Sequence, residues 1–186
     1  MQLRKLLFLL SILITFNSLA QKNKPSPSLS VEQIPTPPDS DIRLFFIQRS
    51  SSIDVILYDA YLGLDKKLDS KNPVHAYWLR YTNGGKKQEL SSIQRTLAYG
   101  LYTKPISGEQ GSYDGHFLAY RKRRFVVKMN AKGQPIALFP INGKMQVLKK
   151  VYVNVDESGM IPKVIYVELW GRDAVTDKEV YEKFKP

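Results

Sequence analysis

The sequence contains no cysteine, which excludes disulfide bonds, thiolate metal ligands and cysteine nucleophiles. It has only two histidines, His75 and His116, so general bases and zinc ligands are scarce. No metal-binding or cofactor-binding motif is complete, and we expect neither a metal nor a cofactor. Acidic residues are also few, with 17 against 28 Lys and Arg, which gives the 186 residues a net charge of +11. Such a charge favours anionic partners.

The first 20 residues have the order of a secretory signal peptide. Residues 1–5 include two basic side chains, and residues 6–16 carry no charge. Ser18 and Ala20 then place small residues at the −3 and −1 positions of a cleavage site. The uncharged stretch is too short for a membrane span, which needs about 20 apolar residues. We therefore expect an exported protein, periplasmic or secreted, with no transmembrane segment after cleavage.

Composition predicts three segments. Residues 1–20 form the signal peptide, residues 21–40 a Pro-rich spacer, and residues 41–186 a single β-rich domain. Five of the eleven prolines fall in the spacer, and proline resists both helices and sheet ladders. We expect the spacer to be extended, with little apolar surface to bury.

Most of the domain has the pattern of β-strands. Runs rich in β-branched and aromatic residues, bounded by turn residues, predict strands at residues 44–49, 53–58, 74–81, 116–129, 136–141, 145–155 and 161–170. The last four follow one another with short turns, which predicts an antiparallel meander. A curved antiparallel sheet or a small β-barrel would leave few open edges.

Two short helices complete the expected fold, which is mainly β with an α+β character. Residues 91–94 (SSIQ) fit a capping box and predict an inserted helix, in which Ile93 and Leu97 share one face. Residues 176–179 (TDKE) repeat the box and predict a C-terminal helix. That helix would dock on the sheet through Val180, Tyr181 and Phe184.

Four blocks of the sequence carry a resemblance to a known family. They are residues 44–50 (LFFIQRS), 73–81 (PVHAYWLRY), 89–95 (ELSSIQR) and 98–100 (AYG). In combination they resemble the domain-of-unknown-function 4833 family, over about residues 43–170. The resemblance implies an exported or envelope-associated protein, and it carries over no catalytic residue.

One pair of residues leaves a hydrolase open. Asp114 and His116 lie two apart beside an expected strand and could point the same way, as two members of a catalytic triad do. A turn aspartate beside a strand-edge histidine is the simpler interpretation. No nucleophile elbow supports the hydrolase, because residues 111–115 (GSYDG) have the wrong glycine frame and lead into a strand.

Two arginines stand out on the longest expected strand. Alternation from Phe117 to Met129 places Arg121 and Arg123 on the side with the apolar residues. An unpaired buried charge is costly, so these arginines need carboxylates, a bound anion or an opening to water. The competing interpretation is a bulge near residue 121 that turns them outward.

These residues define the expected binding site and function. We predict that a ligand contacts residues of the cupped sheet, namely Arg49, Tyr77, Arg80, Arg121 and Arg123. The leading hypothesis is a non-enzymatic binding or accessory protein of the cell envelope that holds an anionic amphiphile or glycan, not nucleic acid. The alternatives are a hydrolase that uses Asp114 and His116, and a protein–protein adaptor in an envelope complex.

The predicted signal peptide, residues 1–20, leads to the first testable prediction. Protein isolated from its native envelope should begin at Gln21, because cleavage is set to follow Ala20. N-terminal sequencing of the exported protein measures this directly. Retention of residues 1–20 on that protein would contradict both the expected export and the expected cleavage.

Overall fold

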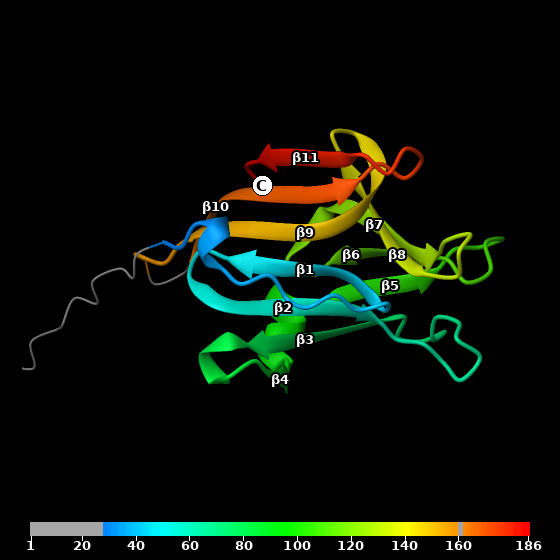
Figure 1. Ribbon diagram of the computed structural model, residues 1–186, viewed down its shortest axis with the longest axis horizontal. Coiled ribbons are helices and arrows are strands. Elements are labelled where there is room, and N and C mark those ends of the chain that lie inside the picture. Colours follow the sequence, from blue (N-terminus) through cyan, green and yellow to red (C-terminus); the bar gives the residue numbers. More distant parts are fainter. Residues whose placement is uncertain (1–27, 160–161) are drawn as a thin grey trace, which may run out of the picture.

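The computed structural model describes residues 28–159 and 162–186 (Figure 1). The predicted signal peptide and residues 21–27 of the spacer lie outside the described residues. Within them, no helix is long and apolar enough to cross a membrane.

The described residues form one strongly curved sheet with very little helix (Figure 1). Its strands are β1 (Arg43–Arg49), β2 (Ser52–Ala60), β3 (Val74–Arg80), β4 (Lys86–Glu89), β5 (Leu101–Pro105), β6 (Tyr113–Phe117), β7 (Tyr120–Met129), β8 (Pro135–Ile141), β9 (Lys144–Asp156), β10 (Lys163–Arg172) and β11 (Glu179–Phe184). Three short helical turns accompany them: η1 (Val31–Gln33), η2 (Tyr81–Asn83) and η3 (Gln94–Ala98). The predicted mainly β class is confirmed, and the sheet curls into a half-barrel.

Two antiparallel meanders make up the sheet. One runs from β1 to β4 and the other from β5 to β11, with each strand paired to the next. The predicted meander at the C-terminal end is therefore confirmed. A single parallel pairing joins the two, with Phe46–Arg49 of β1 opposite Lys150–Val153 of β9.

The long strand β9 is the point where the sheet branches. One edge of β9 pairs with β8 over residues 144–147 and then with β1 over residues 150–153. The other edge pairs with β10. Because β8 and β1 share one edge of the same strand, they diverge from it and leave a hollow interior.

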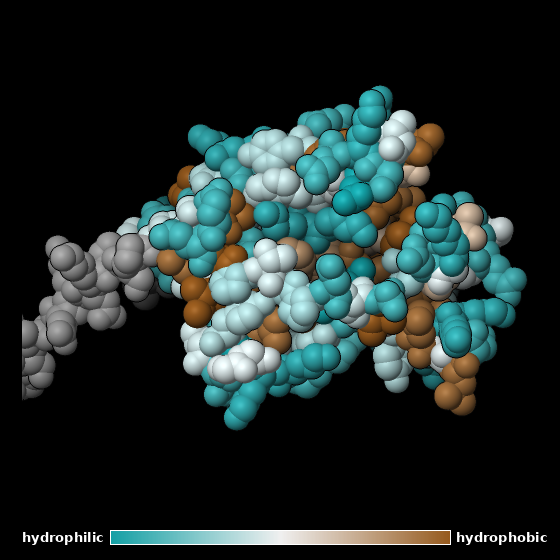
Figure 2. Space-filling view, in the orientation of Figure 1, coloured by the Kyte–Doolittle hydropathy of each residue, from teal (hydrophilic) through white to brown (hydrophobic). Residues whose placement is uncertain are grey.

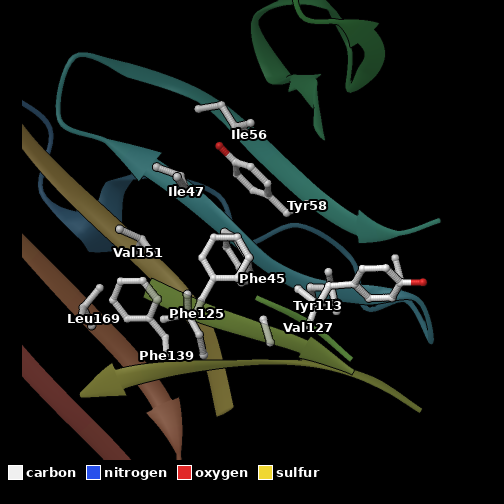
Figure 3. Packing of buried hydrophobic residues seen from close by; sticks show 14 of the residues in the cluster. Phe45, Ile47, Ile56, Tyr58, Tyr113, Phe125, Val127, Phe139, Val151 and Leu169 are labelled. Carbon is white, nitrogen blue, oxygen red and sulfur yellow. The ribbon is translucent and has the colours of Figure 1, made fainter. Parts of the chain in front are cut away.

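The main core fills the floor of this interior. Phe45 stacks on Tyr58 with ring centroids 4.5 Å apart, and Phe117 meets both rings edge-on. Figure 3 shows the side chains of β1, β2, β7, β8, β9 and β10 converging on one another here. This core, not the loops, fixes the shape of the half-barrel.

The predicted C-terminal helix is not confirmed, because residues 179–184 form strand β11. Asp173 accepts hydrogen bonds from the backbone N–H groups of Val175 and Thr176, so a tight turn takes the place of the capping box. Residues 180, 182 and 184 are half-buried while their neighbours are exposed. Burial that alternates from one residue to the next has the two-residue period of a strand. The four-residue spacing of Val180 and Phe184 also fits one face of a helix, so these two residues alone do not distinguish the two structures.

The predicted inserted helix is not confirmed as a regular α-helix. Its region holds the π-type turn η3, only five residues long. The capping-box contacts do form: Ser91 N donates to Gln94 Oε1 at 3.0 Å, and Gln94 N donates to Ser91 Oγ at 3.3 Å. The turn ends just before Gly100, which lies against the Arg95 carbonyl. A Cβ at this position would be only 1.6 Å from the carbonyl oxygen, so the position requires glycine.

The strand expected at residues 116–129 is in fact two strands. A tight turn at Leu118 and Ala119 separates β6 from β7. The backbone N–H of Leu118 donates to the carbonyl of Gly100 at 2.9 Å, which turns the chain away from a straight ladder. The alternation of side chains between the two faces of the sheet therefore restarts at Tyr120. The continuous face that was predicted from Phe117 to Met129 is interrupted at this turn.

Residues 28–40 lie against the outer face of the sheet, as Figure 1 shows in blue. Leu29 and Ile34 pack with side chains of β2, β3 and β9 in a second apolar cluster. The Tyr152 hydroxyl donates to the Leu29 carbonyl at 2.5 Å, and Gln48 Nε2 donates to the Ile34 carbonyl at 3.0 Å. This part of the Pro-rich segment therefore buries apolar surface, unlike the spacer that the composition predicted.

The packing of this segment can be tested with one truncated side chain. Ile34 is only 3% exposed, so Ile34→Ala should lower the unfolding free energy by about 2 kcal/mol or more, as buried truncations do. The exposed Asp39 is the matched control, and Asp39→Ala should cost less than about 0.5 kcal/mol. Urea denaturation measures both. Equal stability of the two variants would mean that the segment does not pack in solution.

Candidate ligand cavity

A cavity of about 530 Å³ lies on the inner side of the half-barrel. Buried residues of β1, β8, β9 and β10 form its floor: Ile47, Phe139, Val151 and Leu169. Exposed residues form its rim: Leu97, Glu157, Pro162, Val164 and Pro186. The lining is overwhelmingly apolar, and its charged side chains are Arg49 and Glu157. Size and lining are those of a small-molecule site.

Arg49 is the last residue of β1, and the parallel pairing sets it opposite Val153 of β9. Its guanidinium carbon lies 5.2 Å from the centroid of the Trp78 ring and 5.6 Å from that of Tyr99. Among the described residues no carboxylate forms an ion pair with it, and its Nε is buried without a hydrogen-bond partner. A buried donor without an acceptor is costly. Arg49 therefore keeps hydrogen-bond donors that the described residues do not use.

The turn η3 supplies one wall of the cavity. Trp78 Nε1 donates to Gln94 Oε1 at 3.2 Å, and the Tyr58 hydroxyl donates to the Tyr99 carbonyl at 2.8 Å. Tyr99 also meets the Trp78 ring edge-on, at 5.3 Å between centroids. Burial raises the pKa of the Tyr99 hydroxyl. These contacts tie η3 to β2 and β3, and they hold Tyr99 beside Arg49.

Arg80, a predicted site residue, has its own carboxylate. Its Nη1 lies 2.9 Å from Asp54 Oδ2, and its Nε donates to Gln88 Oε1 at 2.9 Å. Asp54 also accepts from the backbone N–H and the hydroxyl of Thr82. Burial opposes the charge of Asp54, but the hydrogen bonds from Thr82 and Arg80 together lower its pKa. Arg80 thus stabilises the fold behind Trp78 and does not line the cavity.

Tyr77, also predicted for the site, belongs to the apolar cluster on the outer face. Its hydroxyl donates to Asp59 Oδ2 at 2.6 Å, and Arg43 pairs with the same carboxylate. Burial and the bond to Asp59 raise the pKa of Tyr77 to about 12. The structure therefore places Tyr77 on the opposite side of the sheet from Arg49.

Arg123 forms an ion pair with the C-terminal strand. Its Nη2 lies 2.5 Å from Glu182 Oε1, and its Nη1 lies 3.0 Å from Glu182 Oε2. Its guanidinium also covers the ring of Phe184 at 3.9 Å. Hydrogen bonds from Arg123, with one from the Asn142 backbone, lower the pKa of Glu182. This contact fastens β11 to β7.

The five predicted site residues are thus not brought together. Arg121 is exposed on β7 and, like Arg123, is not part of the cavity lining. Of the five, Arg49 alone lines the cavity among the described residues. Tyr99 and Val164 also line the cavity, and the sequence analysis did not predict either as a site residue. The only signal for Tyr99 was the apolar run at residues 97–99, which follows the capping box.

The alternative pair, Asp114 and His116, shows no mutual hydrogen bond among the described residues. Asp114 instead pairs with Arg124, whose Nε donates to Oδ1 at 2.9 Å. The His116 ring packs on Tyr102 at 5.2 Å between centroids. Nor do the described residues hold any group of three His, Asp or Glu side chains that could bind a metal ion.

The chain belongs to the family described as Domain of unknown function (DUF4833), whose model matches residues 45–183, most of the chain. The family resemblance of the four sequence blocks is therefore confirmed. No curated protein and no solved structure matches the chain.

The ion pair between β7 and β11 makes a prediction about stability and pH. Arg123→Met should lower the unfolding free energy by about 1.5–3 kcal/mol at neutral pH, the range for hydrogen bonds to charged groups. Arg121→Met should change it by less than about 0.5 kcal/mol. Urea denaturation measures both, and equal losses in the two variants would contradict the pairing.

The sign of the pH dependence follows from Glu182. Its folded pKa lies below the unfolded value of about 4.3. The pair therefore stabilises the fold fully above that pH, and this contribution disappears as the pH falls through the lowered pKa. The stability difference between wild type and Arg123→Met should shrink correspondingly in acid.

Proposed function

We propose that this protein binds an anionic amphiphile, with the apolar part in the cavity and the acidic group on Arg49. The observation that supports the proposal is a guanidinium without an ion-pair partner among the described residues, in a largely apolar cavity of about 530 Å³ whose other charged side chain, Glu157, is exposed at the rim. Binding rather than catalysis is proposed because the described lining residues include no Ser, Thr, His or Asp, and the one carboxylate side chain among them, Glu157, lies at the exposed rim.

The lining favours an acyl chain over a glycan. A glycan presents hydroxyl groups that need hydrogen-bond partners, and unpaired ones are costly to bury. The cavity floor provides no such partners among its described residues, because Ile47, Phe139, Val151 and Leu169 have apolar side chains. An acyl chain loses only its contact with water there, which is favourable at about 25 cal/mol per Å² of apolar surface.

Arg49 is suited to the acidic end of such a ligand. A guanidinium can bind a carboxylate or phosphate through two parallel hydrogen bonds. Contacts with Trp78 and Tyr99 restrict the plane of the guanidinium before a ligand arrives, so little side-chain freedom is lost on binding. The predicted export supports the proposal further, since outside the cytoplasm envelope lipids are an abundant source of anionic amphiphiles.

The proposal predicts a loss of affinity that depends on the charge of the ligand. Arg49→Met should weaken binding of a dansylated undecanoic acid by about tenfold or more, the effect of losing a charge-assisted hydrogen bond. Binding of its uncharged methyl ester should hardly change. Fluorescence titration measures both ligands, and urea denaturation checks that the variant is folded.

Two control variants sharpen the result. Arg121→Met removes an exposed arginine outside the cavity and should bind the acid like the wild type. Val167→Trp fills the cavity, since Val167 is one of its lining residues, and should weaken both ligands. If wild type binds neither ligand, or if Arg49→Met binds the acid as wild type does, the proposed function is wrong.

A further inference from the structure

Four large apolar side chains are exposed near the rim of the cavity. Ile93 is 72% exposed and Leu97 69%, both at η3; Val164 and Ile165, on β10, are 45% and 42% exposed. Leu97 and Val164 line the cavity itself, and each of the other two is near one of them in the chain. The apolar surface therefore continues from the cavity floor to the outside of the protein.

The local backbone keeps these side chains outside. Ile93 and Leu97 are four residues apart and lie on one face of the turn, as the sequence predicted. The turn η3 is held by Trp78 and Tyr58 through polar contacts, and its apolar face has no such partner among the described residues. On β10 a register shift between Val164 and Tyr166 leaves the consecutive residues 164 and 165 both exposed.

The positive net charge of the protein favours a negatively charged surface as the partner of this rim. The whole chain carries +11, and residues 1–27 hold only four of its basic side chains, so the described residues are strongly basic as well. At the rim itself Lys163 is exposed next to Val164, and it offsets the carboxylate of Glu157. An anionic bilayer attracts basic residues by about 1 kcal/mol for each one near its surface. It also accepts exposed apolar side chains into its interfacial region.

We infer that the rim of the cavity docks on an anionic lipid bilayer, with Ile93, Leu97, Val164 and Ile165 in the interfacial region. Hydrophobic residues also reach the surface beside the start of β10, at the left in Figure 2. The inference rests on the proposed function, and it makes the ligand a membrane amphiphile that passes between bilayer and cavity without crossing water. The docked rim brings the bilayer to the side of the cavity where Arg49 lies.

Vesicle sedimentation of the expected exported form, residues 21–186, tests the docking without the apolar run at residues 6–16. The double variant Ile93→Glu with Ile165→Glu, at two exposed rim residues outside the cavity lining, should bind phosphatidylcholine vesicles containing phosphatidylglycerol at least about tenfold more weakly than wild type, because two apolar side chains no longer enter the interface. Wild type should bind pure phosphatidylcholine vesicles more weakly, and salt should reduce its binding to the anionic ones.

The chain offers a matched control. Leu64 and Val175 are even more exposed, at 108% and 92%, and neither lines the cavity. Leu64→Glu with Val175→Glu adds the same charge and should bind anionic vesicles within about twofold of wild type, as expected for charges screened at a distance. Equal loss in the two double variants would show a general charge effect and overturn the docking.

Two further results distinguish docking from ligand binding and from dimerisation. The rim variant should still bind the dansylated acid in solution, since Arg49 and the cavity floor are intact and neither Ile93 nor Ile165 lines the cavity. Failure of the ligand assay would therefore contradict the proposed function, and failure of the vesicle assay would contradict the docking. If wild type does not bind the vesicles and the rim variant converts a dimer into a monomer in light scattering, a second copy covers the rim. That outcome would overturn the inference.

Discussion

The parallel pairing of β1 with β9 is the contact on which the rest of the structure depends. Each meander is held by local hairpins, but only this ladder, from Phe46 to Arg49, joins their strands into one sheet among the described residues. It also makes β1 an interior strand, and its neighbour β2 is buried on both faces. The inner face of β2 packs in the main core, and the outer face is covered by residues 28–40.

The same pairing creates the cavity. Since β8 and β1 occupy successive parts of one edge of β9, the two walls separate beyond their shared strand. Arg49 ends β1 at that opening, where Trp78 and Tyr99 restrict it. Ion pairs neutralise the neighbouring arginines, Arg80 with Asp54 and Arg123 with Glu182. Arg49, in the cavity lining, thus keeps hydrogen-bond donors that the described residues do not use.

Local signals in the sequence predicted β1 to β3 and the hairpins from β8 to β10, because their period and turn residues are short-range properties. Asn142-Gly143, for example, adopts the positive backbone angles that its hairpin requires. The local signals missed β4, β5 and β11, and they merged β6 with β7. Long-range contacts could not be read in this way. Residues 176–179 match a helix cap, yet Asp173 and the pairing with β10 impose a strand. Arg49 was identified as a site residue, but only the pairing with β9 shows that it is the arginine at the cavity.

The ladder between β1 and β9 also has a kinetic consequence. Phe46 and Lys150 are more than 100 residues apart in the sequence, and closing so long a loop makes folding slow compared with hairpin formation. During synthesis, β1 to β4 are complete long before β9 exists. The edge of β1 stays unpaired for that interval, and an unpaired edge readily adds a strand from another chain. Until β9 arrives, this edge is therefore where the chain is open to pairing with a second copy.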